Sequence, residues 1–309
     1  MSAAQPAGPA VEAAQCLPPL APVWRVAKRL PRGSCDAHFH VFGPASEYPL
    51  DPRRGYTPSP ADIDDYRQVM EAYGIDRAVA VQPSVYGFDN SAMFAALAAM
   101  PDALRGVGVI APDAPEALFA EAHRLGVRGL RINPRNPAGL TMQHLARVGV
   151  RAVALGWHIQ LQIAIDDHPD LTTVAARAGV PIVIDHFGFP DLARGADDRA
   201  FAGLVDLAAS GACFVKLSAP YRNAGEPDCY PLLAPFVERL VERAPDSLLW
   251  GLDWPHTECF EAIADDNPIL DLIWDWLPSN ELRRKVLIDN PSRLYWNGEP
   301  LQPSPGSTQ

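Results

Sequence analysis

The feature that most constrains the fold is a repeated alternation of short β-branched runs with helical patterns. Runs rich in Val, Ile and Leu predict strands, and helical periodicity lies between most of them. The predicted strands are residues 35–41, 77–84, 105–111, 126–133, 158–165, 181–187, 213–219 and 248–254. Eight strand–helix units in about 260 residues fit a single α/β domain folded as a (β/α)8 TIM barrel. A doubly wound parallel sheet is the main alternative, and only the count of eight disfavours it.

The helical patterns are amphipathic and end at glycine. Within residues 60–74, Ile63 and Met70 belong to an apolar stripe with a spacing of three or four residues, and Gly74 is the predicted stop. Gly149 weakens one of the other patterns. The remaining predicted helices are residues 90–100, 114–126, 141–155, 168–179, 198–211 and 230–244.

Composition excludes several classes of protein. The net charge of −11 and the sequence pI near 5.1 disfavour a nucleic-acid or anionic-membrane surface. The 5 cysteines are scattered and form no C-x-x-C pair, which favours reduced thiols in the cytoplasm. No apolar run reaches the roughly 18 residues of a membrane span, and the N-terminus lacks the features of a signal peptide.

The sequence divides into three parts without an internal domain boundary in the barrel. Residues 1–33 read as a flexible Ala/Pro-rich arm that packs down near Trp24, and residues 34–297 form the barrel. Residues 298–309 read as a loose tail.

Alternate residues of a strand face opposite sides, so one set per strand should face the barrel axis. The sets assigned to the axis are polar in nearly every strand, mostly toward the C-terminal end, where TIM-barrel active sites lie. Unpaired buried polar groups cost roughly 1–3 kcal/mol each, so this pattern predicts an enzyme site rather than an inert core. The assigned residues are Asp36, His38, His40, Gln82, Ser84, Arg131, Asn133, His158, Gln160, Gln162, His186, Lys216, Ser218 and Asp253. Val79 and Val81 are assigned to the helix side, and Ile182 and Ile184 are assigned to the axis beneath His186. His158 is placed low in the barrel, and Lys216 receives no role.

The strongest group within this set is His38, His40, His186 and Asp253, from the first, sixth and eighth predicted strands. The H-x-H pair alone is a weak signal, and its context strengthens it. Its context consists of the motifs DAHFHVFGP, YTPSPAD, VQPSVYGFDN, GVRGLRIN, VIDHFG, FVKLSAPYR and WGLDWPH. Through these motifs, from about Ser34 to Trp296, the chain resembles the amidohydrolase superfamily and its amidohydrolase-2 branch. Within that branch it is most similar to the 2-pyrone-4,6-dicarboxylate lactonases.

The resemblance implies hydrolysis of a small, acidic cyclic ester by water attack. Asp253 would be the general base, and His38, His40 and His186 would donate hydrogen bonds or hold Asp253 in place. The substrate-binding candidates are Arg131, Asn133, Arg222, Tyr56 and Ser84. Arg131 is the best candidate for binding an anion, because its guanidinium can bind a carboxylate with two hydrogen bonds.

The chain departs from the two-metal pattern of the superfamily. Arg131 and Asn133 stand where a bridging lysine is expected, and Gln160 and Gln162 stand where a histidine is expected. A dinuclear centre is therefore disfavoured. The same three histidines and Asp253 could hold a single Zn²⁺ or Mn²⁺. The lactonases that the chain resembles work without a metal, so the resemblance favours no cofactor, with a single divalent metal as the alternative.

Two other functions stay open at this point. One is a metal-dependent decarboxylase or a lactone isomerase of the same branch, and the other is a non-catalytic ligand-binding barrel. The expected partner is a small anionic lactone, without nucleic acid or membrane. Homo-oligomerisation is left open.

Overall fold

The computed structural model describes residues 13–22, 29–136, 138–299 and 301. Its strands form one parallel sheet in which every strand lies between its sequence neighbours. They are β1 (Cys35–Phe39), β2 (Arg77–Val81), β3 (Leu104–Gly108), β4 (Val127–Ile132), β5 (His158–Leu161), β6 (Ile182–Ile184), β7 (Cys213–Ser218) and β8 (Leu248–Gly251). The ring closes between β8 and β1, because the Asp253 amide donates to the His38 carbonyl and the His40 amide to the Trp254 carbonyl, both at 2.8 Å. The TIM-barrel prediction is confirmed.

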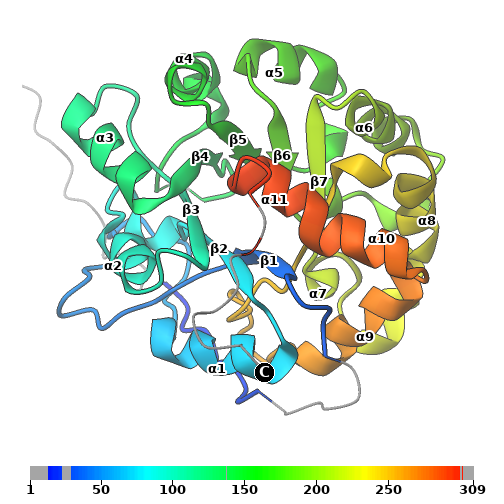
Figure 1. The fold of residues 1–309 in the computed structure, drawn as a ribbon, viewed down its shortest axis with the longest axis horizontal. Helices are drawn as coiled ribbons and strands as arrows, with labels where there is room; N and C mark the ends of the chain where they lie inside the picture. Colours follow the sequence, from blue (N-terminus) through cyan, green and yellow to red (C-terminus); the bar gives the residue numbers. More distant parts are fainter. Residues whose placement is uncertain (1–12, 23–28, 137, 300, 302–309) are drawn as a thin grey trace, which may run out of the picture.

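Helices surround this ring, as Figure 1 shows. Seven of them match predicted segments: α1 (Ile63–Tyr73), α2 (Ser91–Ala99), α3 (Glu116–Leu125), α4 (Leu145–Leu155), α5 (Leu171–Ala178), α6 (Arg199–Ala209) and α8 (Ala234–Arg243). Four were not predicted: α7 (Pro220–Ala224), α9 (Asp266–Trp276), α10 (Asn280–Arg284) and α11 (Asn290–Tyr295). A π-helical turn, Lys285–Asp289, joins α10 to α11.

The ends of α1 illustrate how local sequence sets the element. The Asp62 carboxylate caps the first turn by accepting from the amides of Asp64 and Asp65. Gly74 ends the helix in the left-handed region, with φ of 78°, as its position in the sequence predicted.

Two hydrophobic clusters lie on opposite sides of the strands. The larger cluster joins the outer strand faces to the helices. The smaller cluster fills the N-terminal part of the barrel and includes Tyr295 and Trp296 at the end of α11. Figure 1 shows α11 crossing this end of the ring. The strand residues of the smaller cluster are Cys35, Ala37, Val79, Val81, Val107, Val183, Phe214 and Leu249. The barrel is therefore apolar toward its N-terminal end and polar toward its C-terminal mouth.

Residues 13–22 of the arm lie along two loops of the mouth. The Cys16 amide donates to the Thr57 carbonyl at 2.8 Å, and the Leu17 amide donates to the Cys259 carbonyl at 2.9 Å. Trp24 lies outside the described residues, so its predicted packing stays a prediction. All 5 cysteines are described and are free thiols, and none of the described helices is long and apolar enough to cross a membrane.

Candidate active site

The four residues predicted to form the catalytic group meet at the mouth of the barrel. Oδ1 of Asp253 lies 3.5 Å from Nε2 of His38, 3.7 Å from Nε2 of His40 and 3.8 Å from Nε2 of His186. All four side chains are buried, with His40 the most exposed at 3%. One carboxylate oxygen thus faces three imidazole nitrogens.

The protonation states follow from burial and from the hydrogen bonds. Burial lowers the pKa of His40 to about 3 and that of His186 to about 4, so both rings are neutral at neutral pH. Nδ1 of His40 lies 2.7 Å from the Val81 carbonyl, which can only accept, so the proton sits on Nδ1 and Nε2 keeps its lone pair. His40 and Asp253 therefore face each other as two acceptors.

The other oxygen of Asp253 is fully engaged. Oδ2 accepts hydrogen bonds from the Tyr221 hydroxyl at 2.6 Å and from Nε of Arg222 at 2.7 Å. Burial opposes ionisation of Asp253, but the Arg222 guanidinium and the nearby imidazoles hold its pKa well below the usual range. Asp253 is thus a carboxylate with one oxygen fixed and the other, Oδ1, unbonded.

Backbone conformation brings two of these residues to the axis. Asp253 has φ of 63° and His186 has φ of 53°, and left-handed backbone costs a residue with a side chain roughly 1–2 kcal/mol. His186 begins a turn immediately after β6, and its Nδ1 lies 2.8 Å from the Ser218 hydroxyl. Backbone strain of this kind is common at functional sites, where the surrounding structure holds the strained residue in place.

A second layer of polar groups lies directly beneath His38. Nζ of Lys216 is 2.8 Å from Oε1 of Gln160 and 3.3 Å from both Nδ1 of His38 and Oδ1 of Asp185. Lys216 and Asp185 are fully buried. Burial raises the pKa of Asp185, but the Lys216 ammonium lowers it more, so this pKa lies well below the usual range. Asp185 was not among the predicted axis residues, and Lys216 had no assigned role.

Three predicted orientations were wrong. Ile182 and Ile184, which were assigned to the axis, belong to the larger outer cluster, and Asp185 faces the axis instead. The predicted phase was taken from His186, which turns inward beyond the strand end because its backbone is left-handed. Val79 and Val81 belong to the inner cluster, so β2 has the opposite phase to that predicted. Asp36 accepts from the Tyr66 hydroxyl of α1 at 2.7 Å, because the pairing of β1 with β2 shifts register after Asp36.

The five predicted substrate-binding residues all line one pocket above Asp253. They share it with catalytic candidates and with loop residues that were not predicted for this role. Its lining is His40, Tyr56, Ser84, Arg131, Asn133, Arg135, Asn136, Gln162, His186, Arg222, Asp253, Thr257 and Glu258. His38 lies below the pocket rather than in its wall.

The two arginines among the predicted substrate-binding residues have different partners in this pocket. Arg131 is 4% exposed and donates to the Gln82 carbonyl at 2.9 Å and to the Gln162 amide oxygen. Arg222 is held by Asp253 and, at 2.7 Å, by Glu258. Their guanidiniums supply positive charge on the pocket wall, in a chain of net charge −11. Glu258 was not predicted because it lies in a loop, where strand periodicity gives no signal.

The residues at the mouth fit a single metal ion. His38, His40 and Asp253 offer ligand atoms within 4.8 Å of one another, and Nε2 of His38 and Oδ1 of Asp253 are buried without a hydrogen-bond partner. Imidazole and carboxylate are the ligands that Zn²⁺ prefers besides thiolate. His186 would be the fourth ligand, as predicted from the sequence.

Comparison with known proteins gives the same family along nearly the whole chain. The family profile described as Amidohydrolase matches residues 35–296. A 2-pyrone-4,6-dicarboxylate hydrolase of Comamonas testosteroni is 35% identical over 282 residues, covering 88% of this chain and 92% of that protein. A 4-sulfomuconolactone hydrolase of Rhizobium radiobacter is 38% identical over 274 residues, covering 86% and 91%.

A solved structure agrees with these relatives. The crystal structure of a putative 2-pyrone-4,6-dicarboxylic acid hydrolase from Pseudomonas putida superposes with a TM-score of 0.71 at 33% identity, covering 86% of this chain and 98% of that one. The barrel, the mouth geometry and these matches lead to one conclusion. The chain belongs to the amidohydrolase family.

Proposed function

We propose that the protein hydrolyses a small lactone that carries at least one anionic group. The relatives named for lactone hydrolysis support the reaction class. Arg131 and Arg222 line the pocket and support an anionic substrate. Candidate substrates are 2-pyrone-4,6-dicarboxylate, 4-sulfomuconolactone and sugar-acid lactones, which share an ester ring and an acidic substituent.

The observation that carries the proposal is the unbonded Oδ1 of Asp253 facing the imidazoles. A water molecule between Oδ1 and Nε2 of His40 could donate a proton to either acceptor. Because Arg222 and Tyr221 fix Oδ2, Asp253 cannot rotate away from this position. Asp253 is therefore the proposed general base, and its geometry rather than a raised pKa makes it one.

The proposed steps balance as simple ester hydrolysis. The water loses a proton to Asp253 as its oxygen bonds to the lactone carbonyl carbon, which gives a tetrahedral oxyanion. Collapse of this oxyanion breaks the bond from the acyl carbon to the ring oxygen, which leaves with the proton held by Asp253. Arg131 binds the anionic substituent and orients the ring. The Ser218 hydroxyl donates to Nδ1 of His186, and the proton on Nε2 of this neutral imidazole stabilises the oxyanion.

We further propose that the reaction needs no resident metal. A divalent ion held by His38, His40, His186 and Asp253 would polarise the carbonyl and acidify the water. The chain already supplies cations to the same groups, since Arg222 binds Asp253 and Lys216 lies 3.3 Å from His38. These cations compensate the buried carboxylates without an ion.

The test combines metal analysis with an assay of acidic lactones. Purified protein, with and without chelator, is given 2-pyrone-4,6-dicarboxylate and a sugar-acid lactone, and proton release is followed. We expect hydrolysis that chelator leaves unchanged, and loss of at least a hundredfold in kcat for Asp253→Asn. Asp206→Asn, an exposed carboxylate on α6, is the matched control.

Other results would assign a different reaction. Release of carbon dioxide would support the decarboxylase, and a rearranged lactone without proton release would support the isomerase. Activity lost with chelator and restored by Zn²⁺ or Mn²⁺ would replace the metal-free mechanism. Binding without turnover of any lactone would leave the non-catalytic barrel.

We also propose a cytoplasmic protein that works on a small molecule without nucleic acid. The acidic net charge and the free thiols support this. Homo-oligomerisation stays an open prediction.

A further inference from the structure

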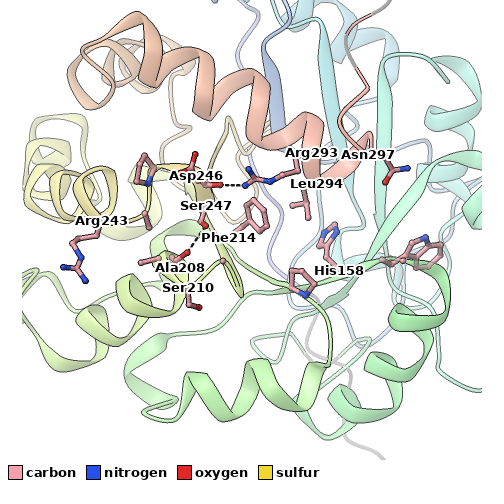
Figure 2. A pocket seen from close by; sticks show the side chains of 17 residues that line it. His158, Ala208, Ser210, Phe214, Arg243, Asp246, Ser247, Arg293, Leu294 and Asn297 are labelled. Carbon is pink, nitrogen blue, oxygen red and sulfur yellow. Dashed lines mark hydrogen bonds between the residues drawn. The ribbon is translucent and has the colours of Figure 1, made fainter.

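A second cavity lies at the N-terminal end of the barrel, opposite the mouth. It has a volume of about 600 Å³, which is within the usual range of small-molecule sites. It opens between the end of α6, the segment that follows α8, and α11, and Phe214 of β7 and His158 of β5 belong to its wall (Figure 2). None of the groups proposed for lactone hydrolysis lines it.

The wall of this cavity carries one cation that is not neutralised. Arg243 pairs with Asp206 at 3.4 Å, and Lys285 pairs with the Asp246 carboxylate. Arg293 donates to the Asp246 backbone carbonyl, which carries no net charge, and no carboxylate among the described residues pairs with it. In Figure 2 the Arg293 guanidinium lies between Asp246 and Leu294, on the cavity side of α11.

Aromatic and apolar groups lie next to this cation. The Arg293 guanidinium carbon is 5.4 Å from the centre of the Phe214 ring, and Phe214 is 6% exposed. Trp157, Leu294 and Pro181 also line the cavity. A bound group would therefore meet a charge at the rim and an apolar surface below it.

The inner wall also holds a polar side chain whose hydrogen bonds are unmet. His158 is 2% exposed, and neither ring nitrogen has a hydrogen-bond partner of good geometry. Burial lowers its pKa to about 3, and the adjacent Arg128 backbone offsets this only in part, so the ring is neutral. Buried polar atoms are normally satisfied, and an unsatisfied one beside a cavity indicates a ligand or a bound water.

We propose that this cavity is a second ligand site that takes a small planar carboxylate. The carboxylate binds the free N–H groups of Arg293, and the ring packs against Phe214 beside His158. A guanidinium recognises a carboxylate by charge-assisted hydrogen bonds, and an aromatic wall favours a flat apolar body. The proposal does not depend on the lactone chemistry at the mouth.

Binding of 4-fluorobenzoate, followed by fluorine NMR, tests the proposal. We expect saturable binding to the wild-type protein and at least tenfold weaker binding to Arg293→Gln. Arg293→Lys keeps the charge and should fall between the two, and Phe214→Leu should weaken binding several-fold. The matched control is Arg239→Gln, an arginine on α8 that does not line this cavity and should bind as the wild type does.

The mouth also carries arginines, so Arg131→Gln separates the two sites. Binding that persists in Arg131→Gln and is lost in Arg293→Gln supports the second site. Binding that is lost in Arg131→Gln, that is unchanged in Arg293→Gln, or that is absent from the wild type at millimolar probe overturns it. The neutral analogue 4-fluorobenzamide should bind at least tenfold more weakly, and equal binding of the two probes would also contradict a carboxylate site. Urea unfolding of each variant confirms that it is folded.

Discussion

Lys216 is a fully buried ammonium directly beneath the imidazole of His38. Burial lowers its pKa, and the neighbouring Asp185 carboxylate opposes this effect. Each of these groups compensates the charge of the other in a place that water does not reach. Loss of one partner would leave the other as an uncompensated buried charge, which is far more costly than loss of a surface pair.

We therefore expect Lys216→Met to lower the free energy of unfolding by about 3–5 kcal/mol. The double variant Lys216→Met/Asp185→Asn should recover part of this loss, because the side chain that Lys216 leaves behind is then neutral. Lys285→Met, which breaks the more exposed pair with Asp246, is the control and should cost at most about 1 kcal/mol. Urea unfolding at pH 7.5 measures all three, and equal effects of the two lysine variants would contradict the pairing.

At this scale, alternation along the strands predicted part of the site. It brought His38, His40 and Asp253 to one face, and the convergence of the carboxylate with the imidazoles is confirmed. It failed for Asp185, because the phase of β6 was taken from His186. Asp185 keeps an extended backbone after the strand, whereas His186 is left-handed, so neighbouring residues both reach the axis. A two-residue period holds only while the chain stays in a strand.

Single elements show where packing overrides local preference. Gly149 weakens the helical prediction for α4, yet the helix forms and Gly149 is buried. A Cβ atom at this position would lie 2.3 Å from the Ala178 carbonyl oxygen, at the end of α5. The glycine therefore permits close contact of the two helices, at the expense of helix propensity.

This contact reverses the usual effect of a glycine-to-alanine substitution. Gly149→Ala should destabilise the protein by about 1–3 kcal/mol, because backbone atoms must move apart. Gly203→Ala is the matched control, since Gly203 lies within α6 and a Cβ atom there would meet no described atom within 4 Å. That variant should be neutral or stabilising by up to about 1 kcal/mol. Thermal unfolding compares them, and a stabilised Gly149→Ala would refute the close contact.

Residues 13–22 of the arm contact loops of the proposed site. Besides its bond from Cys16 to Thr57, it offers the Cys16 sulfur to the Glu258 amide at 3.3 Å. Glu258 in turn binds Arg222, and Thr57 follows Tyr56 of the pocket. The arm was predicted as a segment, but its contacts were not, because they join residues far apart in sequence.

Removal of residues 1–18 should therefore raise KM for the lactone several-fold, with a smaller fall in kcat. The loops that carry Tyr56 and Glu258 would lose backbone partners, while Asp253 keeps its bonds to Arg222 and Tyr221. Removal of residues 1–12 preserves every described arm contact and is the control. Steady-state kinetics of both truncations decides the matter, and equal kinetics of the two would exclude a role for this contact.

For the whole molecule, the number of repeats was enough to predict the barrel. Each strand is buried on both faces and contains a short apolar run, a pattern that can be recognised in a single sequence. The stretch after β8 was missed. No helix was predicted there, although α9 follows β8 as the helix of the eighth unit, and α10 and α11 lie beyond the repeat that guided the prediction. This stretch includes Tyr295 and Trp296, which plug the N-terminal end of the barrel.

The buried histidines make the stability of the whole molecule depend on pH. The pKa of His158 is about 3 in the folded protein and about 6.5 in an unfolded chain. As the pH falls below 6.5, the unfolded state binds the proton first, so stability is lost progressively down to about pH 3. At pH 5 the loss from this one group is about 2 kcal/mol. Burial lowers the pKa of His40 and His186 in the same direction.

His158→Gln should remove this share of the acid sensitivity. Urea unfolding at pH 7.5 and pH 5.0 gives the pH-dependent change in unfolding free energy for each protein, whatever the absolute stability of the variant. We expect the change to shrink by about 2 kcal/mol in His158→Gln, and to stay as in the wild type in His168→Gln, a half-buried histidine between β5 and α5. An undiminished change in His158→Gln would mean that His158 takes up its proton in the folded state as readily as in the unfolded chain, which is incompatible with the burial of its ring.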